Sequence, residues 1–176
     1  MKGWLWRGGG RPCRRACNQY SPSALAQRVH EACVAHGIRL ALAESCTGGY
    51  LAHLLTSIPG ASNYLSCSIV AYSKEAKTGL LGVESKLIEK HGTISPECAL
   101  AMATGVAKAT GSDAALSVTG NLGPEPMEDK ATGLVYIAVY FRGKARVREF
   151  RFTGQRGKIK EMASEEALRM LIQELG

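Results

Sequence analysis

The chain has 176 residues, of which 45% are hydrophobic and 21% are charged, and its formal net charge is +7 at pH 7. This length and composition are typical of one globular domain that buries most of its apolar surface. The sequence contains no apolar run of about 18 residues or more, which excludes a transmembrane helix and leads us to expect no membrane partner.

The positive charge is concentrated near the N-terminus. All six charged residues within residues 1–30 are basic, and the other 146 residues hold 16 basic and 15 acidic groups. The body of the chain therefore has a balance of only +1. Because a surface that tracks phosphates needs a large basic excess, we expect no nucleic-acid partner.

Residues 1–21 differ from the rest of the chain. They contain a glycine run, two tryptophans and no amphipathic period, so we predict a basic, disordered leader before a single domain at residues 22–176. A targeting peptide and a basic contact arm are the alternatives. The apolar stretch "GWLW" is too short for the core of a secretory signal.

The elements expected after the leader begin with a helix. Ser21 is a suitable N-cap and Pro22 favours the first helical position, so we predict a helix over residues 22–36. The short apolar run "IRLALAE" at residues 38–44 indicates a buried strand. A second helix is expected over residues 47–57, because its leucines fall on one face.

The central part of the chain is predicted to contain two strands and three helices. The segment "YLSCSIVAYS" is rich in β-forming residues, and "DAALSVTG" is typical of a buried strand. Ser95-Pro96-Glu97 is a typical helix start. The expected elements are a strand over 64–73, helices over 74–81, 84–91 and 96–110, and a strand over 113–120.

The last part of the chain is predicted to form a hairpin and a helix. Strands over 134–141 and 145–152 are joined by a short turn, and the imperfect alternation of the second indicates an edge strand. An amphipathic helix is expected over residues 156–175. This order of elements predicts an α/β fold, a three-layer α/β/α single domain with a mixed β-sheet.

The six cysteines and four histidines are dispersed along the chain. They show no C-x2-C spacing and no following histidine pair, so we expect neither a metal nor another cofactor. We interpret the cysteines as reduced thiols that act as small hydrophobes in a cytoplasmic protein.

The segment "ESCTGGYLAHLL" at residues 44–55 has the pattern of a strand, a turn and a helix. In this geometry the N–H groups of Thr47, Gly48 and Gly49 are expected to be free for a phosphate or a developing oxyanion. The segment matches neither the dinucleotide nor the triphosphate fingerprint. Local sequence leaves two interpretations of Ser45 open, a helix N-cap and a nucleophile.

A second polar segment, "AYSKEAK", follows the strand predicted over residues 64–73. A lysine that deprotonates a serine needs its pKa lowered from about 10.4 toward 7, which burial could supply. Tyr72 could relay a proton or orient the lysine. The alternative is that Lys74 and Lys77 are solvated helix charges and Tyr72 is an edge aromatic.

Together these segments resemble a known family. The stretches "AESCTGGYLAHLLTSIPGASNYL", "IVAYSKEAKTGLLGV", "HGTISPECALAMATG", "SVTGNLGP" and "ATGLVYIAV" occur in that order. They are similar to the CinA C-terminal domain family over about residues 22–175. Enzymatic members of that family are nicotinamide-nucleotide amidohydrolases, also called nicotinamide mononucleotide deamidases.

The resemblance implies roles for individual residues. The serine of the "ESCTGG" motif is the family's nucleophile and falls on Ser45, and the assisting residues fall on Tyr72 and Lys77. The basic positions near the C-terminal helix fall on Arg156 and Lys160. The substrate-binding residues implied are Thr47, Gly48, Gly49, Thr119, Gly120, Arg156 and Lys160.

Two segments depart from the family pattern. The family commonly has "TGIAGP" followed by a glycine-rich stretch, whereas this chain has "TGNLGP" followed by "EPMEDK". Near the C-terminal helix, Gln155 replaces the family's acid. The added acids Glu125, Glu128 and Asp129 are expected to weaken the binding of an anionic nucleotide if their loop folds over the pocket.

The function implied is that of a cytoplasmic, homo-oligomeric amidohydrolase without metal or cofactor. It would convert nicotinamide mononucleotide to nicotinate mononucleotide and ammonia through Ser45, with Lys77 as base and Tyr72 as relay. One alternative is a non-catalytic CinA-like module that binds a nucleotide or a protein. The other is a hydrolase of the same chemistry that acts on a different amide.

Overall fold

The computed structural model describes residues 21–176, so the predicted leader lies almost entirely outside the described residues. No helix in this part of the chain is long and apolar enough to cross a membrane. The elements, in chain order, are α1 (Pro22–His36), β1 (Leu40–Glu44), α2 (Tyr50–Thr56), the 3-10 turn η1 (Ala61–Asn63), β2 (Leu65–Val70), α3 (Lys74–Leu81), α4 (Ser85–His91), α5 (Pro96–Thr110), β3 (Ala114–Gly120), β4 (Leu134–Phe141), β5 (Lys144–Arg151) and α6 (Arg156–Leu175).

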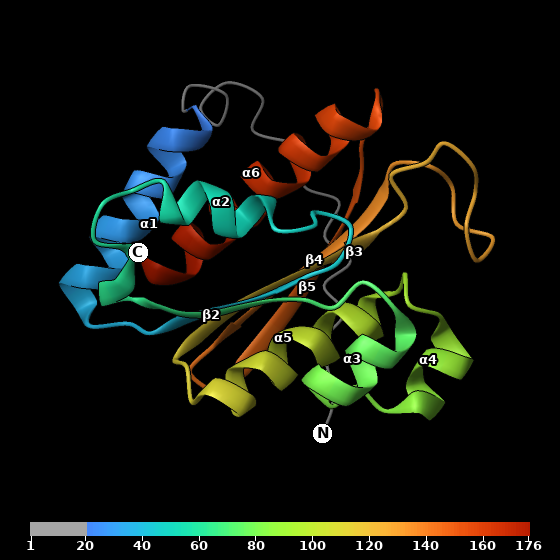
Figure 1. Cartoon of the computed structure of the whole chain (residues 1–176), viewed down its shortest axis with the longest axis horizontal. Helices are drawn as coiled ribbons and strands as arrows, with labels where there is room; N and C mark the ends of the chain where they lie inside the picture. Colours follow the sequence, from blue (N-terminus) through green and yellow to red (C-terminus); the bar gives the residue numbers. More distant parts are fainter. Residues whose placement is uncertain (1–20) are drawn as a thin grey trace.

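The five strands form one mixed sheet in the order β2-β1-β3-β4-β5. Strand β1 pairs in parallel with β2 and β3, and β4 pairs antiparallel with β3 and β5. Helices α1, α2 and α6 cover one face of the sheet, and α3, α4 and α5 cover the other (Figure 1). The predicted three-layer α/β/α domain with a mixed sheet is therefore confirmed, and β5 is an edge strand as expected.

The central strand β1 is apolar on both faces because helices cover both. Leu40 and Leu42 pack in the cluster formed with α1, α2 and α6, whereas Ala41 and Ala43 pack in the cluster formed with α3 and α5. Because successive strand residues point to opposite faces, one continuous apolar run serves both layers.

The imperfect alternation of β5 has a simple cause. Val147 pairs with Ala138 and packs with it on the α5 side, whereas Phe150 pairs with Val135 and packs on the α6 side. The two residues are separated by an odd number of positions, so they face opposite layers. The strand therefore contributes apolar contacts to both sides of the sheet.

Two predicted boundaries were wrong by three residues each. The helix expected from residue 47 begins at Tyr50, since Gly48 and Gly49 take φ values of 55° and 92°, outside the right-handed helical region. The strand expected to reach residue 73 ends at Val70, because Ser73 is the N-cap of α3 and its side chain accepts from the Ala76 N–H.

Candidate active site

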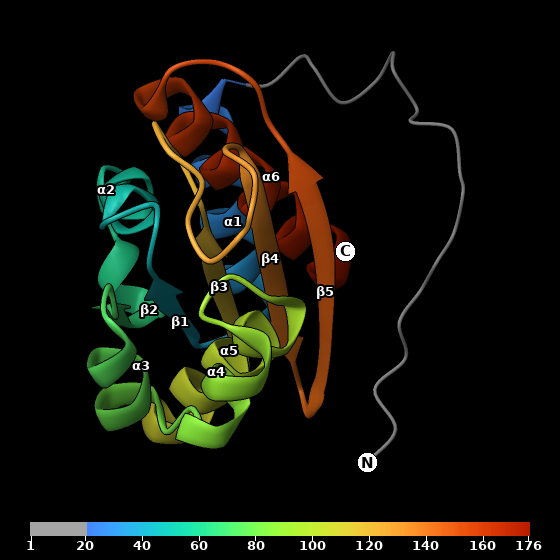
Figure 2. The ribbon, with the colours of Figure 1, turned by 90° about the vertical axis from the view of Figure 1, so that its right-hand side faces the viewer.

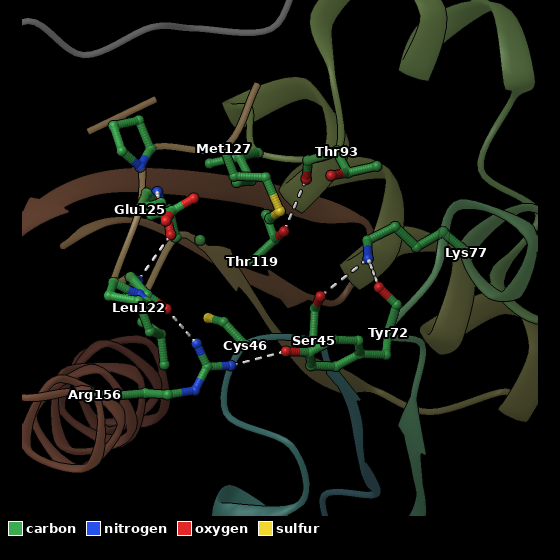
Figure 3. Close-up of a pocket in the computed structure, with 16 residues that line it drawn as sticks. Ser45, Cys46, Tyr72, Lys77, Thr93, Thr119, Leu122, Glu125, Met127 and Arg156 are labelled. Carbon is green, nitrogen blue, oxygen red and sulfur yellow. Dashed lines mark hydrogen bonds between the residues drawn. The ribbon is translucent and has the colours of Figure 1, made fainter. Parts of the chain in front are cut away.

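A cavity of about 330 Å³ lies where the parallel strands end. Its lining comes from the turn after β1, the segment that leads into α3, the segment before α5, the loop between β3 and β4, and the first residue of α6. In an α/β sheet this edge is the usual place for a ligand, because several connections converge there. Figure 3 shows the side chains that meet around it.

Ser45 and Lys77 contact each other directly inside this cavity. The Lys77 Nζ lies 3.0 Å from the Ser45 Oγ, although the residues are 32 positions apart in the sequence (Figure 3). The Lys77 amine also donates to the backbone carbonyls of Ala71 and Tyr72, at 2.8 and 3.2 Å. The predicted association of the serine turn with the lysine segment is therefore present in the structure.

Burial sets the state of Lys77. Its side chain is only 1% exposed, and among the described residues its hydrogen-bond partners are a hydroxyl and two carbonyls, with no carboxylate. Burial lowers the pKa of Lys77 from its ordinary value of 10.5, because the charged form loses its water. Burial thus shifts the pKa of Lys77 in the direction that a lysine base requires.

Lys74 is different and matches the alternative of a solvated helix charge. Its side chain is 42% exposed and lies 3.6 Å from the Glu89 carboxylate on the neighbouring helix α4. Exposed ion pairs of this kind contribute little to stability. The two lysines of the segment are thus separated by the fold into a buried and a solvated group.

The thiol of Cys46 lies beside the cavity but is poorly suited to be a nucleophile. Cys46 packs with the apolar cluster on the α1 and α6 side and also lines the cavity. Burial raises the pKa of this thiol to about 12. A thiol with this pKa stays protonated near neutral pH, and the thiolate is the reactive form. Ser45, whose hydroxyl contacts the buried amine of Lys77, is the better candidate.

Tyr72 reaches Lys77 through its backbone rather than its phenol. The side chain is 61% exposed, and its hydroxyl accepts a 2.8 Å hydrogen bond from Arg156. A second Arg156 nitrogen donates to the Gly123 carbonyl at 2.8 Å. Since Ser45 and Lys77 touch directly, no phenol lies between them to relay a proton. Arg156 instead joins the start of α6 to Tyr72 and to the loop between β3 and β4.

Glu44 was not identified as part of the site by the sequence analysis. This last residue of β1 is fully buried, and its carboxylate accepts from the N–H groups of Gly49, Leu51 and Ala52 and from the Ser68 hydroxyl. It therefore caps α2 and holds the turn that carries Ser45. A carboxylate at the end of a buried strand, directly before a glycine turn, was the available signal.

These hydrogen bonds correct the expectation of free N–H groups in the turn. The Gly49 N–H donates to Glu44, and the Gly48 N–H donates to the Ser45 carbonyl at 3.1 Å. Thr47 is buried, and its hydroxyl has no hydrogen-bond partner. Thr47, Gly48 and Gly49 do not line the cavity. The N–H groups of Gly48 and Gly49 are therefore not free as expected, and the part of the predicted anion site that depends on them is not formed.

Of the remaining predicted residues, Thr119 and Gly120 lie in the cavity lining and Lys160 lies outside it. Thr119 and Gly120 line the cavity, and the Thr119 hydroxyl donates to the Thr93 carbonyl. A Cβ at Gly120 would come within 2.6 Å of the Leu134 carbonyl oxygen, so the close approach of β3 and β4 requires glycine there. The Lys160 amine lies beside Gly48, because a Cβ added to Gly48 would be 3.5 Å from it. Lys160 does not line the cavity.

The loop at residues 121–132 forms one wall of the cavity. The Asn121 amide donates to the Glu125 and Lys130 carbonyls and accepts from the Gly123 N–H. The Glu128 carboxylate accepts from the Thr93 hydroxyl at 2.6 Å and the Ile94 N–H at 3.1 Å. Figure 2 shows the loop bending toward the segment between α4 and α5. Of its three acids, only Glu125 lines the cavity.

The cysteines of the described region are free thiols, and Cys33, Cys46 and Cys98 are buried. Within residues 21–176, no three residues of the types His, Cys, Asp and Glu come together in a way that could hold a metal ion.

Comparisons with known proteins agree with this architecture. The model of the CinA C-terminal domain matches residues 22–175. A competence-damage inducible protein of Moorella thermoacetica is 48% identical over 138 residues, 78% of this chain and 33% of the relative. A CinA-like protein of Desulfotalea psychrophila is 42% identical over 153 residues, 86% of this chain and 37% of the relative.

A solved structure shows the same fold. The crystal structure of a competence-damaged protein (CinA) superfamily protein from Klebsiella pneumoniae has a TM-score of 0.86 and 34% sequence identity, covering 89% of this chain and 98% of that one. This chain spans about a third of the length of the curated relatives that it matches. It belongs to the CinA C-terminal domain family.

Proposed function

We propose that this member of the CinA C-terminal domain family is an amidohydrolase, with Ser45 as nucleophile and the carboxamide of nicotinamide mononucleotide as its target. The observation that carries the proposal is the 3.0 Å contact between the Ser45 hydroxyl and the buried amine of Lys77. A nucleophile and a base within hydrogen-bond reach are the core of covalent hydrolytic catalysis.

The contacts of Lys77 suit the base in its neutral form. A neutral amine has two N–H groups and one lone pair. In the structure the amine donates to the Ser45 hydroxyl and to the carbonyls of Ala71 and Tyr72. Once neutral, it can keep its two N–H groups on the carbonyls, which leaves the lone pair for the Ser45 hydroxyl. The lowered pKa of Lys77 increases the fraction of this neutral form near pH 7.

In the first half-reaction, the Ser45 Oγ attacks the carboxamide carbon while its proton moves to Lys77. Collapse of the tetrahedral intermediate breaks the carbon–nitrogen bond, and Lys77 returns the proton to the leaving ammonia. Water then attacks the acyl-enzyme with Lys77 again as base, which releases the carboxylate and restores Ser45. The pyridinium ring withdraws electrons from the carboxamide and favours both attacks.

We assign the developing oxyanion to the Cys46 N–H and the phosphate to the start of α6. Cys46 follows the nucleophile, and no backbone carbonyl among residues 21–176 accepts its N–H. Arg156 reaches the cavity and Lys160 lies one helical turn further along the same helix. Two cations at a helix N-terminus suit a phosphate.

The proposal is tested by incubating the purified chain with nicotinamide mononucleotide and measuring ammonia together with nicotinate mononucleotide. We expect equal amounts of the two products. Binding without ammonia release would contradict the proposal and favour a non-catalytic module. Ammonia release from other carboxamides, but not from nicotinamide mononucleotide, would support the mechanism and show that the proposed substrate is wrong.

A further inference from the structure

The loop at residues 121–132 is held in place by hydrogen bonds at its base and near its tip. Asn121 is 4% exposed, and its side chain joins three backbone groups of the loop. Glu128 fastens the tip of the loop to Thr93 and Ile94. These bonds hold the backbone of the wall from both ends, and a preorganised backbone favours selective recognition by the side chains that it carries.

The side chain that this wall leaves available is that of Glu125. Its carboxylate forms no hydrogen bond or ion pair within residues 21–176, and only its backbone carbonyl is used, by Asn121. Glu128 is engaged with Thr93 and Ile94, and Asp129 does not line the cavity. Glu125 is thus the one unengaged acid among the residues that the structure places on the cavity wall.

Charged side chains of both signs line the cavity, Lys77 and Arg156 with positive charge and Glu125 with negative charge. Arg156 approaches from α6 with only neutral partners, the Tyr72 hydroxyl and the Gly123 carbonyl. Glu125 lies on the loop side, across the cavity from Ser45 and Lys77 (Figure 3). Met127, which is 50% exposed, adds an apolar thioether to the same wall. A ligand with a flat cationic ring at one end and an anionic group at the other would satisfy both charges.

We propose that Glu125 is a specificity-determining residue that selects carboxamides carried on a positively charged ring over neutral amides. The assignment deepens the proposed amidohydrolase function and rests on it. It opposes the expectation from the sequence that acids in this loop act mainly by repelling the phosphate. The difference arises because the fold engages Glu128 elsewhere and leaves Asp129 off the wall.

The test compares 1-methylnicotinamide, whose ring carries a fixed positive charge, with neutral nicotinamide. The two share the carboxamide and lack a phosphate. Dissociation constants are measured by titration calorimetry or NMR in the full chain with Ser45→Ala, which prevents turnover. We expect the cation to bind about 3- to 10-fold more tightly than the neutral amide, as for a charge pair at a partly solvated site.

Adding Glu125→Gln should bring this ratio close to 1, and about 0.5 M salt should reduce it in the parent. Asp129→Asn also removes one negative charge from the loop, but outside the cavity lining, and should leave the ratio unchanged. An unchanged ratio in Glu125→Gln, or an equal fall in Asp129→Asn, would overturn the assignment. Tighter binding of nicotinamide mononucleotide by Glu125→Gln would also overturn it, since phosphate repulsion would then dominate.

The outcome for Glu125 is distinguishable from that for the function. Ammonia release from nicotinamide mononucleotide is measured with Ser45 intact, whereas the binding ratio is measured without turnover. If the chain releases ammonia but Glu125→Gln does not change the ratio of dissociation constants, the proposed function stands and the role of Glu125 is wrong. If Glu125→Gln changes the ratio but the chain releases no ammonia, the cavity is cation-selective and the proposed hydrolytic function is wrong.

Discussion

At the scale of single residues, the fold gives different environments to side chains that are close together in the sequence. Lys77 and Lys74 lie on the same short helix, yet one is buried against Ser45 and the other pairs with Glu89 in solvent. Ser45 and Cys46 are adjacent, yet only the serine contacts the amine, while burial raises the pKa of the thiol to about 12. Each pair therefore supplies its own matched control.

The first prediction concerns the nucleophile. Ser45→Ala should lower kcat for deamidation by roughly 10³-fold or more, because the attacking oxygen is lost. Cys46→Ala should retain most of kcat and lose stability, since it removes a buried apolar sulfur. Ammonia release and denaturant unfolding measure the two effects. Equal losses of kcat in the two variants would show that Ser45 is not the nucleophile.

The second prediction concerns the base. Lys77→Met keeps the length of the side chain and removes the amine, so kcat should fall to a level near that of Ser45→Ala. Lys74→Ala removes an exposed charge and should change kcat less than about twofold. Steady-state assays of both variants check this. An essential Lys74 would mean that the direct contact seen at Ser45 is not the catalytic one.

The third prediction follows from the lowered pKa of Lys77. Between that lowered pKa and 10.5 the unfolded chain binds more protons than the folded one, so the free energy of unfolding gains a contribution that rises with pH. The cost of burying the amine is fully present below this window and absent above it. Urea unfolding at several pH values should show this rise in the wild type and not in Lys77→Met.

The same group should control activity with pH. As pH rises through the lowered pKa, more Lys77 is neutral, so kcat/KM should increase and then level off below 10.5. A profile that is flat across this range, with deamidation intact, would contradict Lys77 as the base.

At the scale of elements, two buried or anchored carboxylates hold the polypeptide around the cavity. Glu44 ties β1 to the first turn of α2, and Glu128 ties the β3–β4 loop to the segment before α5. Neither residue contacts Ser45 or Lys77 through a hydrogen bond. Their contribution is to fix the segments that carry the reacting groups and Glu125.

The fourth prediction tests the loop anchor. Glu128→Gln should weaken the charge-assisted bonds to Thr93 and Ile94, so amide hydrogens of residues 121–132 should exchange faster and KM should rise. Asp129→Asn removes the same charge without an anchoring contact and should leave exchange unchanged. Hydrogen exchange by mass spectrometry resolves the two. Identical exchange in both variants would show that Glu128 does not order the loop.

At the scale of the whole molecule, small residues allow the layers to approach. Helix α5 packs against the sheet over Ala41, Ala43 and Ala115, and its own Gly105 meets the end of α3. A Cβ at Gly105 would lie 1.9 Å from the Leu81 carbonyl oxygen, a backbone atom that cannot rotate away. The separation of α3 from α5 is therefore set by backbone contact, and α3 carries Lys77.

The fifth prediction uses this contact. Gly105→Ala should destabilise the domain by about 2–4 kcal/mol, because α3 and α5 must separate. Gly79→Ala, at an open position on α3, should stabilise it by about 0.5–1 kcal/mol through helix propensity. Thermal or denaturant unfolding measures both. A neutral Gly105→Ala would show that the helices can move apart without cost.

The sequence by itself determined the type and order of the elements. Local signals such as Ser21 before Pro22 and Ser95 before Pro96 set the starts of α1 and α5, and both serines cap those helices in the structure. These signals work because capping and backbone preference depend on residues within one turn of the chain. The motif resemblance likewise singled out Ser45 and Lys77, whose side chains are in contact in the structure.

Only the tertiary structure decided which side chains from distant parts of the sequence are in contact. The order β2-β1-β3-β4-β5 brings Ser45 to Lys77, Arg156 to Tyr72 and Glu128 to Thr93, contacts that join residues 32, 84 and 35 positions apart. Such contacts depend on which strands pair and where each side chain points, which no local pattern specifies. For the same reason, the turn whose N–H groups were expected to be free is capped by Glu44, and the loop acids divide into an anchor and an unengaged carboxylate.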